Sequence, residues 1–160
     1  KLFELLNDCY SDLYGFSELS PAQVTNLKKN FLNFINPDYI SIILNNNDEL
    51  VGFGVAIPSL SKALQKSKGS LFPFGYFRVR KALKKNDTAD LLLLGVKPEF
   101  QNKGIHSLVF NKLGQTFSDQ NIKFLETTRE LEHNHNVTRL WSMLEYRQHK
   151  RARCYLKELK

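Results

Sequence analysis

The stretch from Leu94 to Ile105 has the residue types of a phosphate-binding turn. An apolar run predicts a strand that ends at Val96, and a helix is expected to begin at Gly104. The first amides of such a helix have no partner within it and the helix dipole is positive there, so the turn can bind a phosphate or pyrophosphate. Gly104 allows close approach, and Lys103 adds positive charge. A plain connection between strand and helix is the alternative interpretation.

Carboxylates follow the next predicted strand. Residues 122–127 predict a strand parallel to the one before the turn. Glu126, Glu130 and Glu132 lie on this strand or directly after it. A carboxylate at the open end of two parallel strands can take a proton from an attacking ammonium group. We expect Glu126 to be this general base, and solvated carboxylates after a strand are the alternative.

His133 and His135 come closest to a metal-binding pattern. The two side chains share one side only if the segment is extended, and no third ligand stands at a suitable spacing. We therefore predict no metal site. The segment is interpreted as a polar loop that leads into a helix capped near Asn134 or Asn136.

The composition indicates one globular domain. Of 160 residues, 42% are hydrophobic and 24% charged, which excludes a disordered tail or a collagen-like repeat. No apolar run approaches the roughly 18 residues of a membrane span, so no transmembrane helix is predicted. Cys9 and Cys154 lack CxxC spacing and indicate reduced thiols in a cytoplasmic protein, with a disulfide as the alternative. Because the chain begins at Lys1 rather than methionine, residues 1–160 are expected to be a domain of a longer chain.

Hydrophobic periodicity predicts helices around a sheet. A helix is expected over about residues 2–13, and Ser20 to Gln23 form a capping signal for a second helix that runs to about residue 35. Tyr39 to Leu44 and Leu50 to Ile57 predict a hairpin. The later elements are strands at 89–96, 122–127 and 153–159 and helices at 104–117 and 136–145. This order predicts an α/β fold with a βαβ unit.

A helical insertion is expected at about residues 58–88. Eight Lys and Arg residues occur between 58 and 86 without an Asp or Glu, interleaved with apolar residues. Two short helices are expected on either side of the segment from Gly69 to Gly75. The insertion is interpreted as a solvated element, and binding of an acidic substrate, a lipid surface or nucleic acid is the alternative. The basic run 147–153 is interpreted as the solvated face of an edge strand, and binding of nucleic acid or of a cofactor phosphate is the alternative.

The series Val96-Lys97-Pro98-Glu99-Phe100-Gln101-Asn102-Lys103-Gly104 resembles the acyl-CoA-binding motif of the GNAT superfamily of N-acyltransferases. That motif is a strand ending V-x-P, then Q/R-x-x-G-x-G/A at the start of a helix. Four segments further resemble the C-terminal GNAT-like domain of longer, mostly uncharacterised bacterial proteins: residues 52–54, 71–75, 101–104 and 148–155. The resemblance implies the GNAT fold, a central mixed sheet flanked by helices, with the basic insertion before the motif strand.

The resemblance also implies residue roles. In the family, the loop amides hold the CoA pyrophosphate, and a bulge in the preceding strand turns its amides toward the thioester carbonyl. By position, the bulge falls on Leu94, Gly95 and Val96, with Gly95 as the bulge residue. Asn136, in the later helix, is a further expected contact to CoA. The expected pyrophosphate-binding backbone is that of Gln101, Asn102, Lys103, Gly104, Ile105 and His106.

Two positions depart from the family pattern. His106 stands where the family usually has Gly or Ala, and its side chain either crowds the pyrophosphate or contacts it. The family often has a tyrosine seven residues after an Asn, which protonates the leaving thiolate, but Asn136 is followed there by Met143. Tyr146 is the nearest phenol, and we expect it to join Glu126 and Glu130 as a catalytic residue.

The resemblance therefore predicts an acyl-CoA-dependent N-acyltransferase, expected to move an acetyl group from acetyl-CoA, or another acyl group from its CoA ester, to an amine. The basic insertion favours an anionic acceptor or a lipid. The alternative is a catalytically degenerate GNAT-fold module that binds CoA or a protein or lipid partner. Nucleic-acid binding has no motif to support it, and a homodimer and a peripheral membrane contact are further alternatives.

Overall fold

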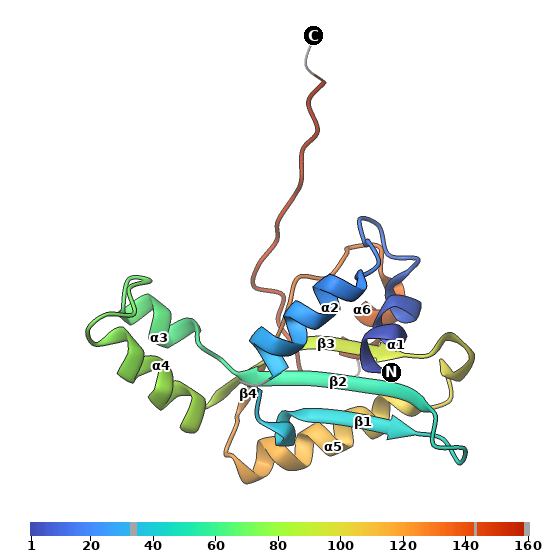
Figure 1. The fold of residues 1–160 in the computed structure, drawn as a ribbon, viewed down its shortest axis with the longest axis horizontal. Coiled ribbons are helices and arrows are strands. Elements are labelled where there is room, and N and C mark those ends of the chain that lie inside the picture. The colour runs from blue at the N-terminus through green and yellow to red at the C-terminus, as the bar shows by residue number, and fades with distance from the viewer. Residues whose placement is uncertain (33–34, 143, 159–160) are drawn as a thin grey trace. The chain divides into compact units, whose positions relative to one another are not determined.

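A sheet of four strands, in the order β1-β2-β3-β4, forms the centre of the fold (Figure 1). The computed structural model describes residues 1–32, 35–142 and 144–158. The strands are β1 (Ile40–Leu44), β2 (Leu50–Pro58), β3 (Thr88–Val96) and β4 (Phe124–Thr127). The first three pair antiparallel, and the crossover from β3 to β4 through a helix makes the sheet mixed. The chain groups into two compact units, Lys1–Glu126 and Thr127–Lys160.

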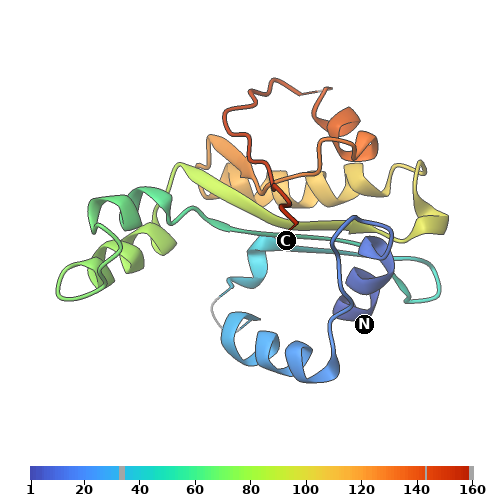
Figure 2. The same ribbon diagram turned by 90° about the horizontal axis from the view of Figure 1, so that it is seen from above.

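Two N-terminal helices cover one face of the sheet and α5 (Ile105–Asp119) covers the other (Figure 2). The N-terminal helices are α1 (Leu2–Tyr10) and α2 (Pro21–Leu27), which a π-helical turn, Lys28–Leu32, continues. The predicted capping signal is confirmed, because the Ser20 side chain accepts the Gln23 amide and the Gln23 side chain accepts the Ser20 amide. Leu5 and Leu6 of α1 pack with residues of β2 to form the core on this face.

Close packing of α5 on β2 depends on two glycines. A Cβ at Gly52 would lie 2.6 Å from Cγ2 of Ile105, and one at Gly54 would lie 2.5 Å from Cγ1 of Val109. Ile105 and Val109 are four residues apart and so share one helix face. The glycines therefore let the first turns of α5 lie directly on the sheet, which fixes where the helix begins.

The predicted insertion is a hairpin of two helices, α3 (Ser61–Lys66) and α4 (Gly75–Lys84), between β2 and β3. The two helices pack against each other and project beyond the end of the sheet in both views (Figures 1 and 2). The prediction of two short helices in this segment is confirmed.

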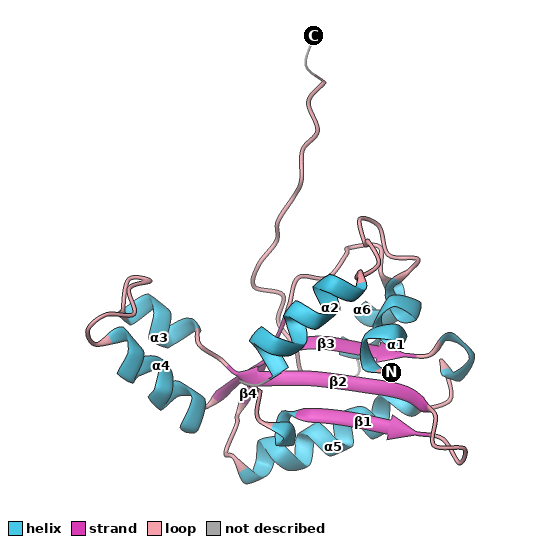
Figure 3. Cartoon of the chain, viewed as in Figure 1, coloured by secondary structure: helices cyan, strands magenta, loops and turns pink. Residues whose placement is uncertain are grey.

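The second unit contains α6 (His135–Trp141), which is shorter than the helix predicted at 136–145. The Asn134 side chain caps it by accepting the Val137 amide at 3.4 Å. The strand predicted at 153–159 is wrong over residues 153–158, which form a loop without strand pairing (Figure 3). An alternating pattern predicts a strand, but a strand needs a neighbouring edge to pair with, and no other described strand pairs with this segment. Met143 and Leu159 lie outside the described residues.

Candidate functional site

The turn between β3 and α5 is built around Gly104. After a 3-10 turn, Pro98–Phe100, the backbone adopts left-handed conformations at Asn102 (φ 57°) and Gly104 (φ 77°). Gly104 is the N-cap of α5, and its carbonyl accepts the Ser107 amide at 3.0 Å. The amides of Ile105 and His106 therefore come before the first hydrogen bond of the helix and are oriented toward the turn.

The surface at this turn has room for a ligand. A Cβ at Gly104 would meet no atom within 4 Å, and Gln101 and Asn102 are exposed. The Lys103 ammonium group lies 5.1 Å from the centre of the Phe100 ring, which keeps a cation beside the turn. With the positive end of a helix of 15 residues, the turn has the charge and the open space that a pyrophosphate needs.

An ion pair lies at the start of the same turn. Nζ of Lys97 lies 3.0 Å from Oε1 of Glu99. Hydrogen bonding to Glu99 raises the pKa of Lys97, and hydrogen bonds from its own backbone amide and from Lys97 lower the pKa of Glu99. Both side chains are therefore charged at neutral pH and neutralise each other, so the positive character of the turn comes from the helix end and Lys103.

Tyr10 of α1 bonds the backbone of β3 where the acyl group is expected. Its hydroxyl donates to the carbonyl of Leu94 at 3.0 Å and accepts the Leu94 N–H at 3.3 Å. Burial raises the pKa of Tyr10, so the phenol stays protonated at neutral pH. Tyr10 lies within the helix predicted over residues 2–13, and the hydrophobic periodicity that predicts this helix does not indicate the contact. Its only signal was that a tyrosine on a buried helix face needs a hydrogen-bond partner.

The contact between Tyr10 and Leu94 is possible because β4 is short. The amides of Lys123 and Phe124 donate to the carbonyl of Asp87 at 2.8 and 3.1 Å, so β4 begins beside the start of β3. Its four residues do not extend along the nine of β3. The edge of β3 at Leu94 is therefore left to Tyr10 rather than to a strand.

The β-bulge expected at Gly95 is wrong. Val55 pairs with Leu93 while Ala56 pairs with Leu91, so Leu92 is the extra residue on β3. Gly95 stands in regular register opposite Phe53, and a Cβ there would lie 2.5 Å from Cε1 of that ring. Gly95 is therefore required for close packing against Phe53, and the bulge of this strand lies at Leu92 instead.

The same added Cβ at Gly95 would lie 3.2 Å from Sγ of Cys9, so this thiol is part of the packing between α1 and β3. Burial, with smaller contributions from Asp8 and Glu99, raises the pKa of Cys9 to about 11. The thiolate, which is the nucleophilic form, is therefore scarce at neutral pH. Cys9 does not have the environment of a catalytic nucleophile.

The predicted catalytic carboxylates have different surroundings. Glu126 lies on β4, is half-buried and ends the first unit, beside the first half of β3 rather than beside Leu94. In the second unit, both carboxylate oxygens of Glu130 accept the indole N–H of Trp141, at 3.0 and 2.8 Å. Glu130 thus has a structural partner as well as its expected catalytic role.

The remaining predicted residues are spread over both units. His106 lies in the first turn of α5 and is half-buried, and Gln101 donates from its side chain to the carbonyl of Val96 at 3.4 Å. Asn136 lies in the first turn of α6, and Tyr146 follows that helix with 62% of its surface exposed. The structure thus brings together residues 94–106, whereas Glu130, Asn136 and Tyr146 belong to the second unit.

The described part of the chain contains neither a group of metal ligands nor a membrane-spanning helix. Within these residues, no three His, Cys, Asp or Glu side chains are grouped so that they could hold a metal ion. In the same part of the chain, every helix is too short or too polar to cross a bilayer.

Solved structures share the fold. A probable acetyltransferase superposes with a TM-score of 0.61 over 99% of this chain and 90% of that one, at 15% identity. AAC(6')-Iy in complex with the bisubstrate analogue CoA-S-monomethyl-acetylneamine superposes with a TM-score of 0.56 over 98% and 92%, at 12% identity. At these identities the likeness shows the fold alone.

Two curated proteins are similar in sequence. Bacterial ceramide synthase of Caulobacter vibrioides (strain NA1000 / CB15N) is 32% identical over 102 residues, which are 62% of this chain and 26% of that protein. Protein YghO of Escherichia coli (strain K12) is 27% identical over 164 aligned residues, covering 99% of this chain and 42% of that protein. The chain therefore spans less than half the length of either relative. The sequence profile of the Acetyltransferase (GNAT) family matches residues 1–146, and the chain therefore belongs to the GNAT acetyltransferase family.

Proposed function

We propose that this chain is an acyl-CoA-dependent N-acyltransferase domain that binds the CoA pyrophosphate at the start of α5. One observation carries the proposal. In a chain of the GNAT family, the amides of Ile105 and His106 come before the first helical hydrogen bond and stand next to the open space at Gly104. Backbone amides and a helix dipole are the groups that bind a pyrophosphate without a metal ion.

The chemistry is transfer of an acyl group from sulfur to nitrogen. A carbon–nitrogen bond forms as the amine attacks the thioester carbonyl, and the carbon–sulfur bond breaks. We assign removal of the ammonium proton to Glu126, directly or through a water molecule, and protonation of the leaving thiolate to Tyr146. The Leu94 N–H is the assigned donor to the thioester carbonyl, which requires Tyr10 to release it.

We further propose that the acceptor is a long-chain amine. The relative from C. vibrioides has the name bacterial ceramide synthase, and a ceramide is the amide of a long-chain amino alcohol. An amphipathic acceptor also suits a chain whose basic insertion exposes aromatic side chains. A related fold solved in complex with sisomicin suggests an aminoglycoside as the contrasting test substrate.

Release of CoA thiol tests this function. The chain is incubated with acetyl-CoA or palmitoyl-CoA and either sphinganine or sisomicin, and free thiol is measured over time. We expect release above the hydrolysis background with sphinganine and none with sisomicin. Release with sisomicin alone would contradict the proposed acceptor. Bound acyl-CoA without release for either amine would support the non-catalytic module instead.

A further inference from the structure

The hairpin α3–α4 concentrates the positive charge of the chain. Its eight cations, in residues 58–86, exceed the net charge of the whole chain, which is +7. Among ion pairs between described residues, only that of Lys62 with Asp87, at 2.8 Å, involves one of them. Arg78 also donates to the carbonyl of Lys66 at 2.8 Å, and the remaining six cations are therefore available to an anionic partner. The eight are Lys62, Lys66, Lys68, Arg78, Arg80, Lys81, Lys84 and Lys85.

A groove of about 810 Å³ lies beside the hairpin, and its concave wall contains cations of the hairpin. Six of the eight line it, together with the carboxylates of Asp87 and Asp119. Asp87 is already paired with Lys62, so the lining keeps a positive excess. Such a surface attracts negatively charged groups, and the groove has room for groups of about the size of a lipid headgroup.

The end of the hairpin is apolar and exposed. We call residues 71–77 the tip. Phe72 is 87% exposed, Phe74 68% and Leu71 55%, and the first turn of α4 adds Phe77 at 65% and Tyr76 at 58%. Large apolar side chains scattered singly over a surface are ordinary, but five exposed ones within seven consecutive residues indicate an interaction site.

Cations lie directly behind the tip on both helices. Lys66 and Lys68 precede it, and Arg78, Arg80 and Lys81 follow it. Along α4, Arg78 to Lys84 extend over about 9 Å at the helical rise of 1.5 Å per residue. The headgroup layer of one bilayer leaflet is about 5–8 Å thick. A tip placed at the edge of the hydrocarbon would therefore bring these cations to the depth of the lipid phosphates.

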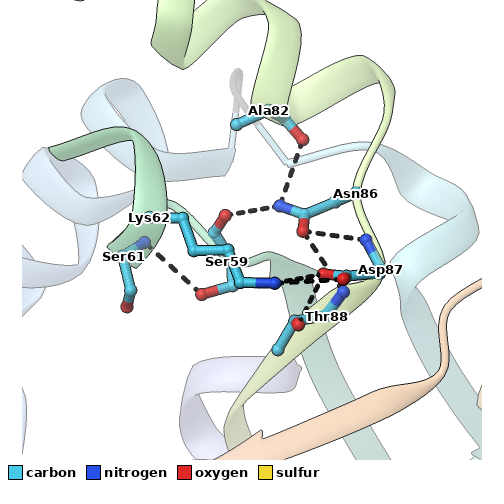
Figure 4. A network of polar contacts seen from close by, with 7 residues as sticks. All are labelled: Ser59, Ser61, Lys62, Ala82, Asn86, Asp87 and Thr88. Carbon is cyan, nitrogen blue, oxygen red and sulfur yellow. Dashed lines mark hydrogen bonds and ion pairs between the residues drawn. The ribbon is translucent and has the colours of Figure 1, made fainter. Parts of the chain in front are cut away.

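The base of the hairpin is held by hydrogen bonds (Figure 4). The Asn86 side chain donates to the carbonyl of Ser59 and accepts the amides of Asp87 and Thr88, at 2.9 and 3.2 Å. Nζ of Lys62 donates to both oxygens of Asp87, at 2.8 and 3.0 Å, and this hydrogen bonding lowers the pKa of Asp87. The network joins the end of β2 to the start of β3, so it fixes the direction in which the tip projects.

We propose that the α3–α4 hairpin docks on an anionic lipid bilayer, with the tip in the interface and the surrounding cations on the lipid phosphates. Aromatic side chains prefer the membrane interface, and clustered Lys and Arg are attracted to anionic headgroups. Single-stranded nucleic acid would also match the charge. Its bases could stack on the exposed rings of Phe72 and Phe74, but nucleic acid gives no apolar surroundings to Leu71 and Pro73 of the same unbroken apolar run. The hairpin lies at the start of β3 and the turn at Gly104 follows its end, so docking leaves the proposed CoA site open.

Vesicle co-sedimentation tests the docking, independently of acyl transfer. The chain is mixed with vesicles of phosphatidylcholine alone or with about 30% phosphatidylserine, at low and high salt. We expect binding only to the anionic vesicles, weakened by salt. Equal binding to both vesicles, or binding to neither, would overturn the proposal. Tighter binding to a single-stranded oligonucleotide at the same salt would overturn it in favour of nucleic acid, and dimerisation without vesicle binding would assign the tip to a second copy.

Two variants separate charge from apolar insertion. Arg80→Gln/Lys81→Gln/Lys84→Gln is expected to weaken binding about a hundredfold, at about fivefold for each cation. The matched control Lys28→Gln/Lys112→Gln/Lys123→Gln removes the same charge from exposed positions outside the hairpin and is expected to bind nearly as the parent does. Phe72→Ser/Phe74→Ser keeps every cation and is expected to weaken vesicle binding at least tenfold. Unchanged vesicle binding of this variant, with an unchanged melting temperature, would contradict insertion of the tip.

Discussion

The hydroxyl of Tyr10 occupies both backbone groups of Leu94, although the two residues are 84 positions apart in the chain. The Leu94 N–H belongs to the strand segment that the family resemblance assigns to the thioester carbonyl. The tyrosine hydroxyl accepts this N–H at 3.3 Å and so fills the place of a ligand acceptor. If the thioester carbonyl accepts this N–H, as we propose, acyl-CoA and the Tyr10 hydroxyl compete for one donor.

Tyr10→Phe tests this competition. Because the variant removes the internal acceptor, we expect acetyl-CoA to bind about fivefold more tightly, which corresponds to one hydrogen bond of about 1 kcal/mol. CoA without an acyl group should bind as it does to the parent. Calorimetric titration measures both, with Tyr14→Phe, at a 91% exposed position, as the control. Weaker binding of acetyl-CoA by Tyr10→Phe than by the parent, with CoA binding unchanged, would instead assign Tyr10 to holding the substrate.

Glu126→Gln tests the assignment of the general base. Loss of proton removal is expected to lower kcat about a hundredfold while the affinity for acyl-CoA stays the same. Glu18→Gln removes the same charge from an exposed position in the same unit and should keep kcat. An unchanged kcat for Glu126→Gln would exclude this residue as the base.

The reactivity of the two thiols reports the packing of α1 on β3. With a pKa of about 11, Cys9 is about 0.1% thiolate at pH 8, so its reaction with a disulfide reagent should be slow and should speed up about tenfold per pH unit up to pH 10. Cys154 is exposed and should react first. The Cys154→Ser variant isolates the slow thiol, and fast reaction of that variant at pH 8 would contradict a buried Cys9.

The raised pKa of Cys9 also predicts that the free energy of unfolding decreases at high pH. The folded state disfavours the thiolate, so this contribution to stability is complete below the unfolded pKa of 9.0. It should be lost as pH rises from 9 toward 11. Urea unfolding of the parent and of Cys9→Ser at pH 8 and pH 10 measures it, and the parent should lose more stability than the variant over this interval.

Gly95→Ala tests the packing role that replaces the expected bulge. The new methyl group would meet Phe53 at 2.5 Å, so we expect a loss of about 1–3 kcal/mol in the free energy of unfolding. Gly114→Ala, in the middle of α5 with no atom within 4 Å of the new methyl, should be neutral or stabilising. Equal stability of the two variants in urea would contradict the close packing of Gly95 on the Phe53 ring.

Local patterns in the sequence predicted most of the fold. The capping box at Ser20, the two helices of the insertion and the helix start at Gly104 all depend on neighbouring residues, and the structure confirms each of them. The bulge was misplaced because Leu91 to Leu94 are four identical residues and carry no mark of register. Tyr10 was missed because its partner is a backbone group of a distant strand, which periodicity does not identify.

Titration with acetyl-CoA of the parent chain, Gly104→Glu and Gly15→Glu tests the proposed pyrophosphate site most directly. Gly15 shares with Gly104 a positive φ, 78° against 77°, and open space at its Cβ, so Gly15→Glu reproduces the strain and the added charge away from the turn. The account expects binding by the parent and by Gly15→Glu, and at least tenfold weaker binding by Gly104→Glu because a carboxylate then faces the pyrophosphate. Equal binding by all three proteins would contradict a CoA site at the start of α5.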